Sequence, residues 1–140
     1  MLKVLPKTCS LPYFRIVNRN LYFAHFLMTL EDLRKFCLSL PHVTEDIKWG
    51  HDLCFCIGGK MFCVTGIEGP LEVSLKVNDE EFEELVASND IIPAPYLARY
   101  KWILIQKTTR FKKKEWEYYV KQSYDLIKEK LPAKINKTLR

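Results

Sequence analysis

The sequence predicts a small α+β domain, an antiparallel β-sheet with an N-terminal and a C-terminal helix packed on it. Gly58-Gly59 separates two apolar runs, and glycine supplies the positive φ that a two-residue hairpin turn needs. Residues 71–77 then alternate between apolar and polar side chains, which is typical of a strand with one face on the core. A length of 140 residues suits one domain with a real core.

Residues 1–27 differ from the rest of the chain. They mix aromatic residues with four basic ones, contain no acid and show no sustained period. We interpret them as an N-terminal extension, upstream of a natural start at Met28; an extra ordered strand and a transit peptide are the alternatives. Thr29 then predicts a helix N-cap with Asp32 completing a capping box, and Pro41 ends the helix near Leu40.

The remaining elements follow in order. A loop over 42–52 leads into hairpin strands at 53–57 and 60–64. On the strand 71–77, Glu72, Ser74 and Lys76 are expected to face water. Asn78 caps a short acidic helix, and 89–101, with two prolines, is expected to be mostly irregular. A strand at 102–106 and a long helix from about 113 to 131 complete the domain, and a basic tail beyond Pro132 is expected to fray.

Charge is distributed unevenly along the chain. The net charge is +5, yet residues 98–140 hold thirteen basic and four acidic side chains, while residues 28–97 are strongly acidic. Such asymmetry favours a polyanionic partner or internal charge pairing. No apolar run is long enough to predict a membrane span. The five cysteines are an odd number, which favours reduced thiols and a cytoplasmic location over a disulfide framework.

Several short motifs occur in a characteristic order from residue 38 to residue 132. They are Leu38-Ser39-Leu40-Pro41, Trp49-Gly50, Gly58-Gly59-Lys60-Met61-Phe62, Ser74-Leu75-Lys76, Pro93 with Leu97 and Trp102, Ser123-Tyr124-Asp125-Leu126, and Lys130-Leu131-Pro132. In this order and spacing, residues 28–132 resemble the MmcQ/YjbR family of small bacterial proteins. The resemblance implies a CyaY-like fold, related to frataxin, and a DNA-binding function.

The chain departs from the family pattern in one loop. There the family usually reads Pro-Gly-Tyr-His-Leu-Asn-Lys-Arg-His-Trp. Ala94, Pro95, Tyr96, Ala98, Tyr100 and Lys101 stand here at the Gly, Tyr, first His, Asn, Arg and second His positions. A function that depends on those histidines or on that asparagine is therefore not expected of this chain.

A cysteine face is the first candidate site. If the hairpin pairs without irregularity, Cys54 lies opposite Cys63, and Cys56 and Met61 share their face. These soft ligands can hold zinc or copper(I), and a Cys54–Cys63 disulfide is a further alternative. We favour packing thiols, with no metal and no cofactor. His51-Asp52 and the pair Ser74 and Lys76 are weaker catalytic candidates, which we interpret as a turn and a solvated strand face.

The second candidate site is a basic segment interleaved with aromatic residues. It comprises Arg99, Lys101, Lys107, Arg110, Lys112, Lys113 and Lys114. Cations neutralise phosphates and aromatic rings stack on bases, so the segment predicts weak DNA binding with little sequence specificity. Trp102 within it is expected to be core. We expect a non-enzymatic protein in either case, and the alternative is a module that binds a protein or a small ligand on the open face of the sheet.

Overall fold

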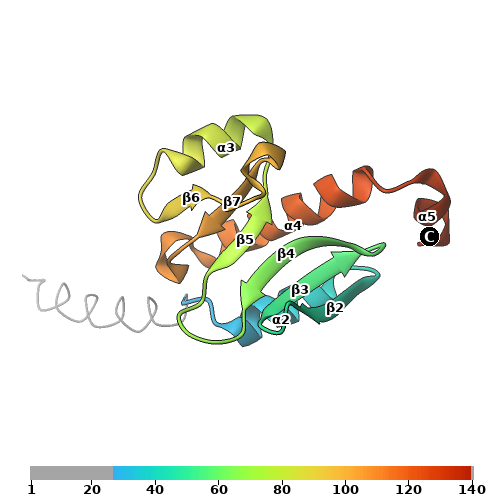
Figure 1. Ribbon diagram of the computed structural model, residues 1–140, viewed down its shortest axis with the longest axis horizontal. Coiled ribbons are helices and arrows are strands. Elements are labelled where there is room, and N and C mark those ends of the chain that lie inside the picture. Colours follow the sequence, from blue (N-terminus) through green and yellow to red (C-terminus); the bar gives the residue numbers. More distant parts are fainter. Residues whose placement is uncertain (1–26, 140) are drawn as a thin grey trace, which may run out of the picture.

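The computed structural model describes residues 27–139. Six antiparallel strands form one sheet in the order β2-β3-β4-β5-β7-β6 (Figure 1). The strands are β2 (Val43–Lys48), β3 (Asp52–Ile57), β4 (Lys60–Gly66), β5 (Val73–Lys76), β6 (Ile91–Pro93) and β7 (Trp102–Ile105). The α+β class and the antiparallel sheet predicted from the sequence are confirmed. The expectations for residues 1–26 lie outside the described residues.

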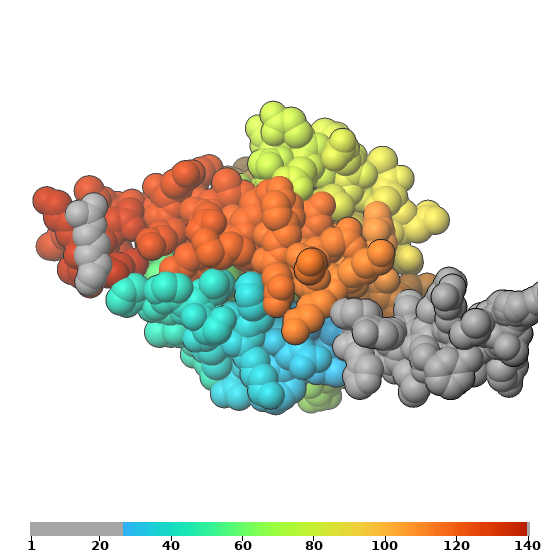
Figure 2. All heavy atoms as spheres, turned by 180° about the vertical axis from the view of Figure 1, so that it is seen from behind, coloured from blue at the N-terminus to red at the C-terminus, as the bar shows by residue number. Residues whose placement is uncertain are grey.

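Two helices cover one face of the sheet. They are α2 (Leu30–Ser39) and α4 (Lys113–Glu129), which lie side by side when the molecule is seen from behind (Figure 2). A third helix, α3 (Asp79–Val86), packs against β6 and β7. On the opposite side, no described helix crosses β3, β4 or β5 (Figure 1). The sheet therefore has one covered face and one open face.

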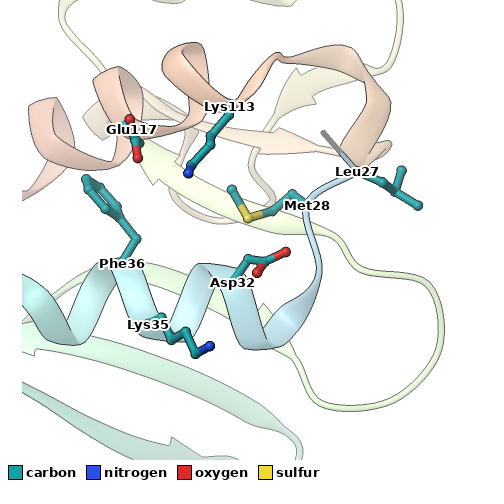
Figure 3. A pocket seen from close by; sticks show the side chains of 7 residues that line it. All are labelled: Leu27, Met28, Asp32, Lys35, Phe36, Lys113 and Glu117. Atoms are coloured by element: carbon teal, nitrogen blue, oxygen red, sulfur yellow. The ribbon is translucent and has the colours of Figure 1, made fainter. Parts of the chain in front are cut away.

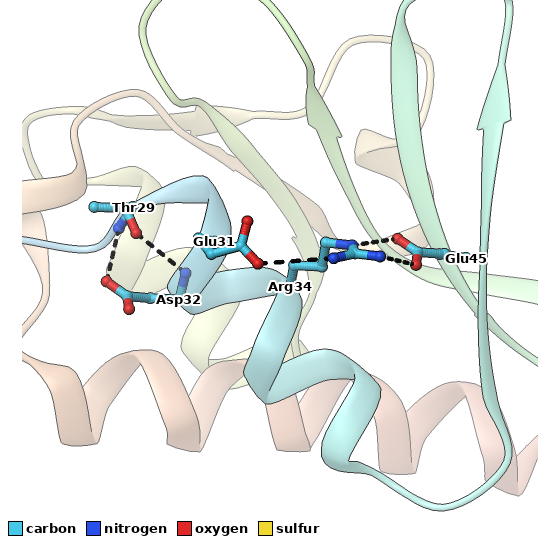
Figure 4. Close-up of polar contacts among 5 residues, drawn as sticks. All are labelled: Thr29, Glu31, Asp32, Arg34 and Glu45. Carbon is cyan, nitrogen blue, oxygen red and sulfur yellow. Dashed lines mark hydrogen bonds and ion pairs between the residues drawn. The ribbon is translucent and has the colours of Figure 1, made fainter.

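The helix α2 begins as predicted and is tied to the edge strand β2. Thr29 Oγ1 accepts a hydrogen bond from the Asp32 N–H at 3.1 Å, and the Asp32 carboxylate accepts one from the Thr29 N–H at 3.3 Å (Figure 4). Arg34 donates two hydrogen bonds to the Glu45 carboxylate, at 2.8 and 2.6 Å. This contact lowers the pKa of Glu45, because the guanidinium hydrogen-bonds the charged form. A local capping signal and one long-range ion pair thus position the helix.

The core lies between the sheet and the helix pair. Val73 and Leu75 of β5 and Ile103 and Ile105 of β7 are fully buried on the covered face. The predicted alternation of the third strand is confirmed for its apolar side. Lys76 differs from the expectation of a solvated side chain, because it is mostly buried and its ammonium donates to the Tyr100 carbonyl.

Ser123 of α4 joins two strands where their pairing ends. Cys63 and Leu75 are the last residues that pair between β4 and β5. Beyond them, the hydroxyl of Ser123 accepts from the Lys76 N–H at 2.9 Å and donates to the Phe62 carbonyl at 2.5 Å. The helix side chain therefore replaces a missing rung of the ladder.

Three segments differ from the sequence prediction. The predicted loop 42–52 contains the strand β2, whose stability comes from pairing with β3 rather than from its own alternation. The expected irregular segment 89–101 contains the short edge strand β6 and a 3₁₀ turn over Ala98–Tyr100. The tail expected to fray forms the helix α5 (Ala133–Thr138), because Ile135 packs against the core.

Candidate functional site

The predicted basic segment is divided by a strand. Arg99 and Lys101 precede β7, whereas Lys107 and the other four cations follow it. A strand of four residues is about 13 Å long, so residues before it and residues after it lie at opposite ends of the strand. The seven residues therefore form two separate groups.

The group before β7 is partly neutralised. The Lys101 ammonium lies 3.7 Å from the Glu83 carboxylate and 4.8 Å from the centroid of the Phe82 ring. The Arg99 guanidinium stacks on the neighbouring Tyr100 ring at 4.8 Å. Only Arg99 of this group remains exposed and without an acid partner among residues 27–139.

The group after β7 is larger and more exposed. Lys107 lies 3.7 Å from Asp90, and Arg110 stacks on Phe111 at 5.5 Å. The three lysines that follow, 112–114, are exposed and form no ion pair within the described part of the chain. Trp102 between the two groups is buried, as predicted.

A pocket between α2 and α4 involves one of these lysines. It has a volume of about 320 Å³, and the Lys113 side chain points into it toward α2 (Figure 3). Asp32, Lys35 and Glu117 also line the pocket, so its two cations meet two carboxylates. This charge balance makes the pocket a poor phosphate site.

A cleft on the open face of the sheet has a different character. It has a volume of about 470 Å³. Its lining comes from the turn before β3, from β4 and β5, and from the loop after β6: Trp49, His51, Asp52, Met61, Val64, Ser74, Pro95, Tyr96 and Leu97. Most of this lining is apolar, and it includes no lysine or arginine.

Two exposed aromatic residues stand at this cleft in an unusual backbone conformation. Trp49 is 65% exposed with φ of 54°, and Tyr96 is 99% exposed with φ of 66°. Left-handed backbone is rare for bulky residues and costs about 1 kcal/mol or more. Because this conformation also leaves both rings in water, burial does not explain either residue.

The cleft also holds the one described histidine that pairs with a carboxylate. His51 Nδ1 lies 3.0 Å from Asp52 Oδ1, and the carboxylate is 30% exposed. These residues occupy the predicted turn before the hairpin. Ser74, predicted on the solvated face, is half-buried at the same cleft, while Lys76 is held away by the Tyr100 carbonyl.

The predicted cysteine face is wrong in its register. A bulge at Phe62 places Cys63 opposite Phe55 and Cys54 opposite Val64, so Cys54 and Cys63 are not cross-strand partners. Cys63 instead packs in the core beside Cys37 of α2, where burial and their hydrogen bond raise its pKa. Burial likewise raises the pKa of Cys54 to about 11. No group of metal-ligating side chains gathers within residues 27–139.

Sequence reasoning named Trp49 and Tyr96 but assigned neither of them to a cleft. Trp49-Gly50 was part of the family resemblance, and Tyr96 follows Pro95 in a loop predicted to be irregular. Their shared feature is positive φ at a central position of a turn, beside Gly50 in one case and Pro95 in the other. Turn positions of this kind usually hold glycine or asparagine, so the residue types themselves did not indicate the conformation.

An antiparallel sheet with a helix pair on one face places this chain among small α+β proteins. No helix in the described part of the chain is long and apolar enough to cross a membrane. The YjbR family model matches residues 38–126. The chain belongs to the YjbR family, as the order of its motifs indicated.

Solved structures agree with this assignment. The structure is similar to that of Deinococcus radiodurans protein DR2400, which contains a DUF419 domain, with a TM-score of 0.73 and 29% identity over 81% of this chain and 88% of that one. It is also similar in fold to a protein from Pseudomonas syringae, with a TM-score of 0.59 and 19% identity over 71% and 98% of the two chains. No curated protein matches the chain.

Proposed function

We propose that this protein is a non-enzymatic binding module whose ligand occupies the cleft on the open sheet face. The pair of exposed aromatic residues in left-handed conformation, Trp49 and Tyr96, carries this proposal. Residues held in sparsely populated backbone conformations concentrate at ligand sites, where the surrounding structure maintains them. Concave, mostly apolar surfaces with a few polar groups are also the usual small-molecule sites.

The polar groups of this cleft favour ligand binding over catalysis. Its histidine is 70% exposed and adjacent in sequence to its carboxylate partner, so water competes for both groups. We also place the protein in the cytoplasm, because its four described cysteines are buried free thiols, which suit a reducing compartment.

The test is a screen of chemically diverse small fragments by heteronuclear NMR on the full chain. Fragments should shift the amide resonances of the cleft, and Trp49→Ala or Tyr96→Ala should abolish those shifts. Tyr118→Ala is the matched control, because Tyr118 is also an exposed aromatic residue but lies on α4 at the covered side. A screen in which no fragment shifts the cleft, or in which the three variants behave alike, would rule this function out.

A second candidate is DNA binding with little sequence specificity through Lys112, Lys113 and Lys114. Their exposure at the start of α4 favours it, since the backbone N–H groups of a helix N-terminus also attract anions. The other four cations of the predicted segment contribute less to this surface. Two of them face Glu83 and Asp90, Arg110 stacks on the Phe111 ring, and Arg99 belongs to the other group.

Replacing all three lysines by Glu should leave folding intact, because exposed charges contribute little to stability. It should abolish retardation of duplex DNA at about 50 mM salt. The control carries the same charge change at Lys60, Lys134 and Lys137. The last two lie on α5, beyond the C-terminal end of α4, and a 17-residue helix is about 25 Å long. Absence of retardation in the wild type, or equal binding by the triple variant, contradicts DNA binding here.

A further inference from the structure

The charges around the open-face cleft are not balanced. Asp52 is the only acidic residue in the lining, which has neither lysine nor arginine. Two lysines lie on neighbouring positions, and both are engaged elsewhere. Lys48 pairs with Asp52 across the strands, but its ammonium lies 3.5 Å from Asp46. The Lys76 ammonium donates to the Tyr100 carbonyl.

The groups that line the cleft come from separate parts of the chain. Asp52 begins β3, with Trp49 in the turn before it, whereas Tyr96 comes from the loop between β6 and β7. Met61 and Val64 of β4 supply an apolar surface between them. A ligand in the cleft therefore meets a hydrophobic floor, two exposed aromatic rings, and one carboxylate that has His51 Nδ1 at 3.0 Å from one of its oxygens.

This combination selects a particular ligand chemistry. Tryptophan and tyrosine rings attract cations through their negative faces, and tryptophan does so best. A carboxylate adds a full opposite charge, and a floor of methionine and valine favours alkyl groups over a strongly hydrated ammonium. A quaternary or alkylated ammonium fits all three features, because its charge is spread over apolar substituents that need few hydrogen bonds.

We infer that the open-face cleft binds an organic cation of the alkylammonium type, held between Trp49 and Tyr96 with Asp52 as its counter-ion. The inference rests on the proposed binding function and names its ligand class. Neutral apolar molecules and nucleobases are the other occupants that such rings accept.

The experiment compares choline with 3,3-dimethylbutan-1-ol, its neutral isostere, by NMR titration of the full chain. Choline should shift the cleft resonances and should bind at least about fivefold more tightly than the alcohol, since shape is equal and only charge differs. Asp52→Asn should weaken choline binding several-fold and leave the alcohol unaffected. Trp49→Ala should weaken choline binding, Trp49→Phe should restore part of it, and Tyr118→Ala should have no effect.

The outcomes separate this inference from the proposed function. If the alcohol binds as tightly as choline, or if only neutral fragments or nucleosides shift the cleft, the cation inference is wrong and the binding function stands. If choline binding does not respond to Asp52→Asn, the counter-ion role is wrong. If neither choline nor any fragment shifts the cleft, both the inference and the proposed function fail.

Discussion

Removal of one hydroxyl group, in Ser123→Ala, should destabilise the protein strongly. The side chain of Ser123 is fully buried and satisfies two backbone groups of different strands, the Lys76 N–H and the Phe62 carbonyl. The variant leaves a donor and an acceptor unpaired in the core. Each such group costs about 1–3 kcal/mol, so we expect a loss of about 2–4 kcal/mol in the free energy of unfolding. That is a large part of the total of about 5–15 kcal/mol typical of a domain.

Urea unfolding followed by circular dichroism measures this loss, provided that the m-value is unchanged. Ser39→Ala is the matched control. Its hydroxyl also bonds a backbone carbonyl, that of Phe36 at 2.6 Å, but it is exposed and water can replace it. The control should change stability by less than about 0.5 kcal/mol. In the Ser123 variant the Lys76 amide should also lose hydrogen-exchange protection. A loss no larger than that of the control would refute the assignment of Ser123 as a bridge between the strands.

Three further changes test other contacts. Gly58→Ala should cost at least about 1 kcal/mol in thermal unfolding, because φ is +58° and the added Cβ would lie 2.7 Å from Leu131. Glu45→Gln should destabilise at neutral pH. Arg34 lowers the pKa of Glu45 in the folded protein, so the stabilisation from this ion pair is fully present above the ordinary glutamate pKa. It is lost as the pH falls through the pKa of Glu45 in the folded protein, and the stabilities of the variant and the wild type should therefore converge in acid. Because burial raises the pKa of Cys54 to about 11, its thiol should resist iodoacetamide at pH 8, as peptide mapping by mass spectrometry would show.

Elements with local signals were predictable from the sequence. The capping box of Thr29 and Asp32, the Gly58-Gly59 turn and the Asn78 cap are set by residues within one turn of each other, and all three occur as expected. They could be predicted because short-range hydrogen bonds and backbone preferences determine them.

Features that depend on distant partners could not be predicted in this way. The strand β2 carries mixed charges and is only half-buried, and its pairing with β3 decides its conformation. The bulge at Phe62 turns Cys63 toward Cys37, which lies on a helix far away in the sequence. Likewise the basic segment is continuous in sequence, but β7 runs through it and places its residues at opposite ends of the strand.

The open-face cleft combines both situations. The sequence predicted that Ser74 faces water, and it did not distinguish between a protein and a small ligand as the partner of the open face. Only the folded chain brings the loop of Tyr96 beside the turn of Trp49. Positive φ at these two residues arises in local turns, closed by hydrogen bonds from the His51 N–H to the Lys48 carbonyl and from the Leu97 N–H to the Ala94 carbonyl.

The two edges of the open sheet affect how the protein behaves in concentrated solution. Within residues 27–139, β2 and β6 each have a neighbour on one side only. Unpaired edges are templates for strand addition by another molecule, and natural sheets block them with charges, proline or short length. Here β2 presents Glu45, Asp46 and Lys48, and β6 is three residues long and ends in Pro93. Both edges therefore disfavour strand addition by another molecule. The open face can be accessible to a ligand while the sheet edges offer no template for fibril growth.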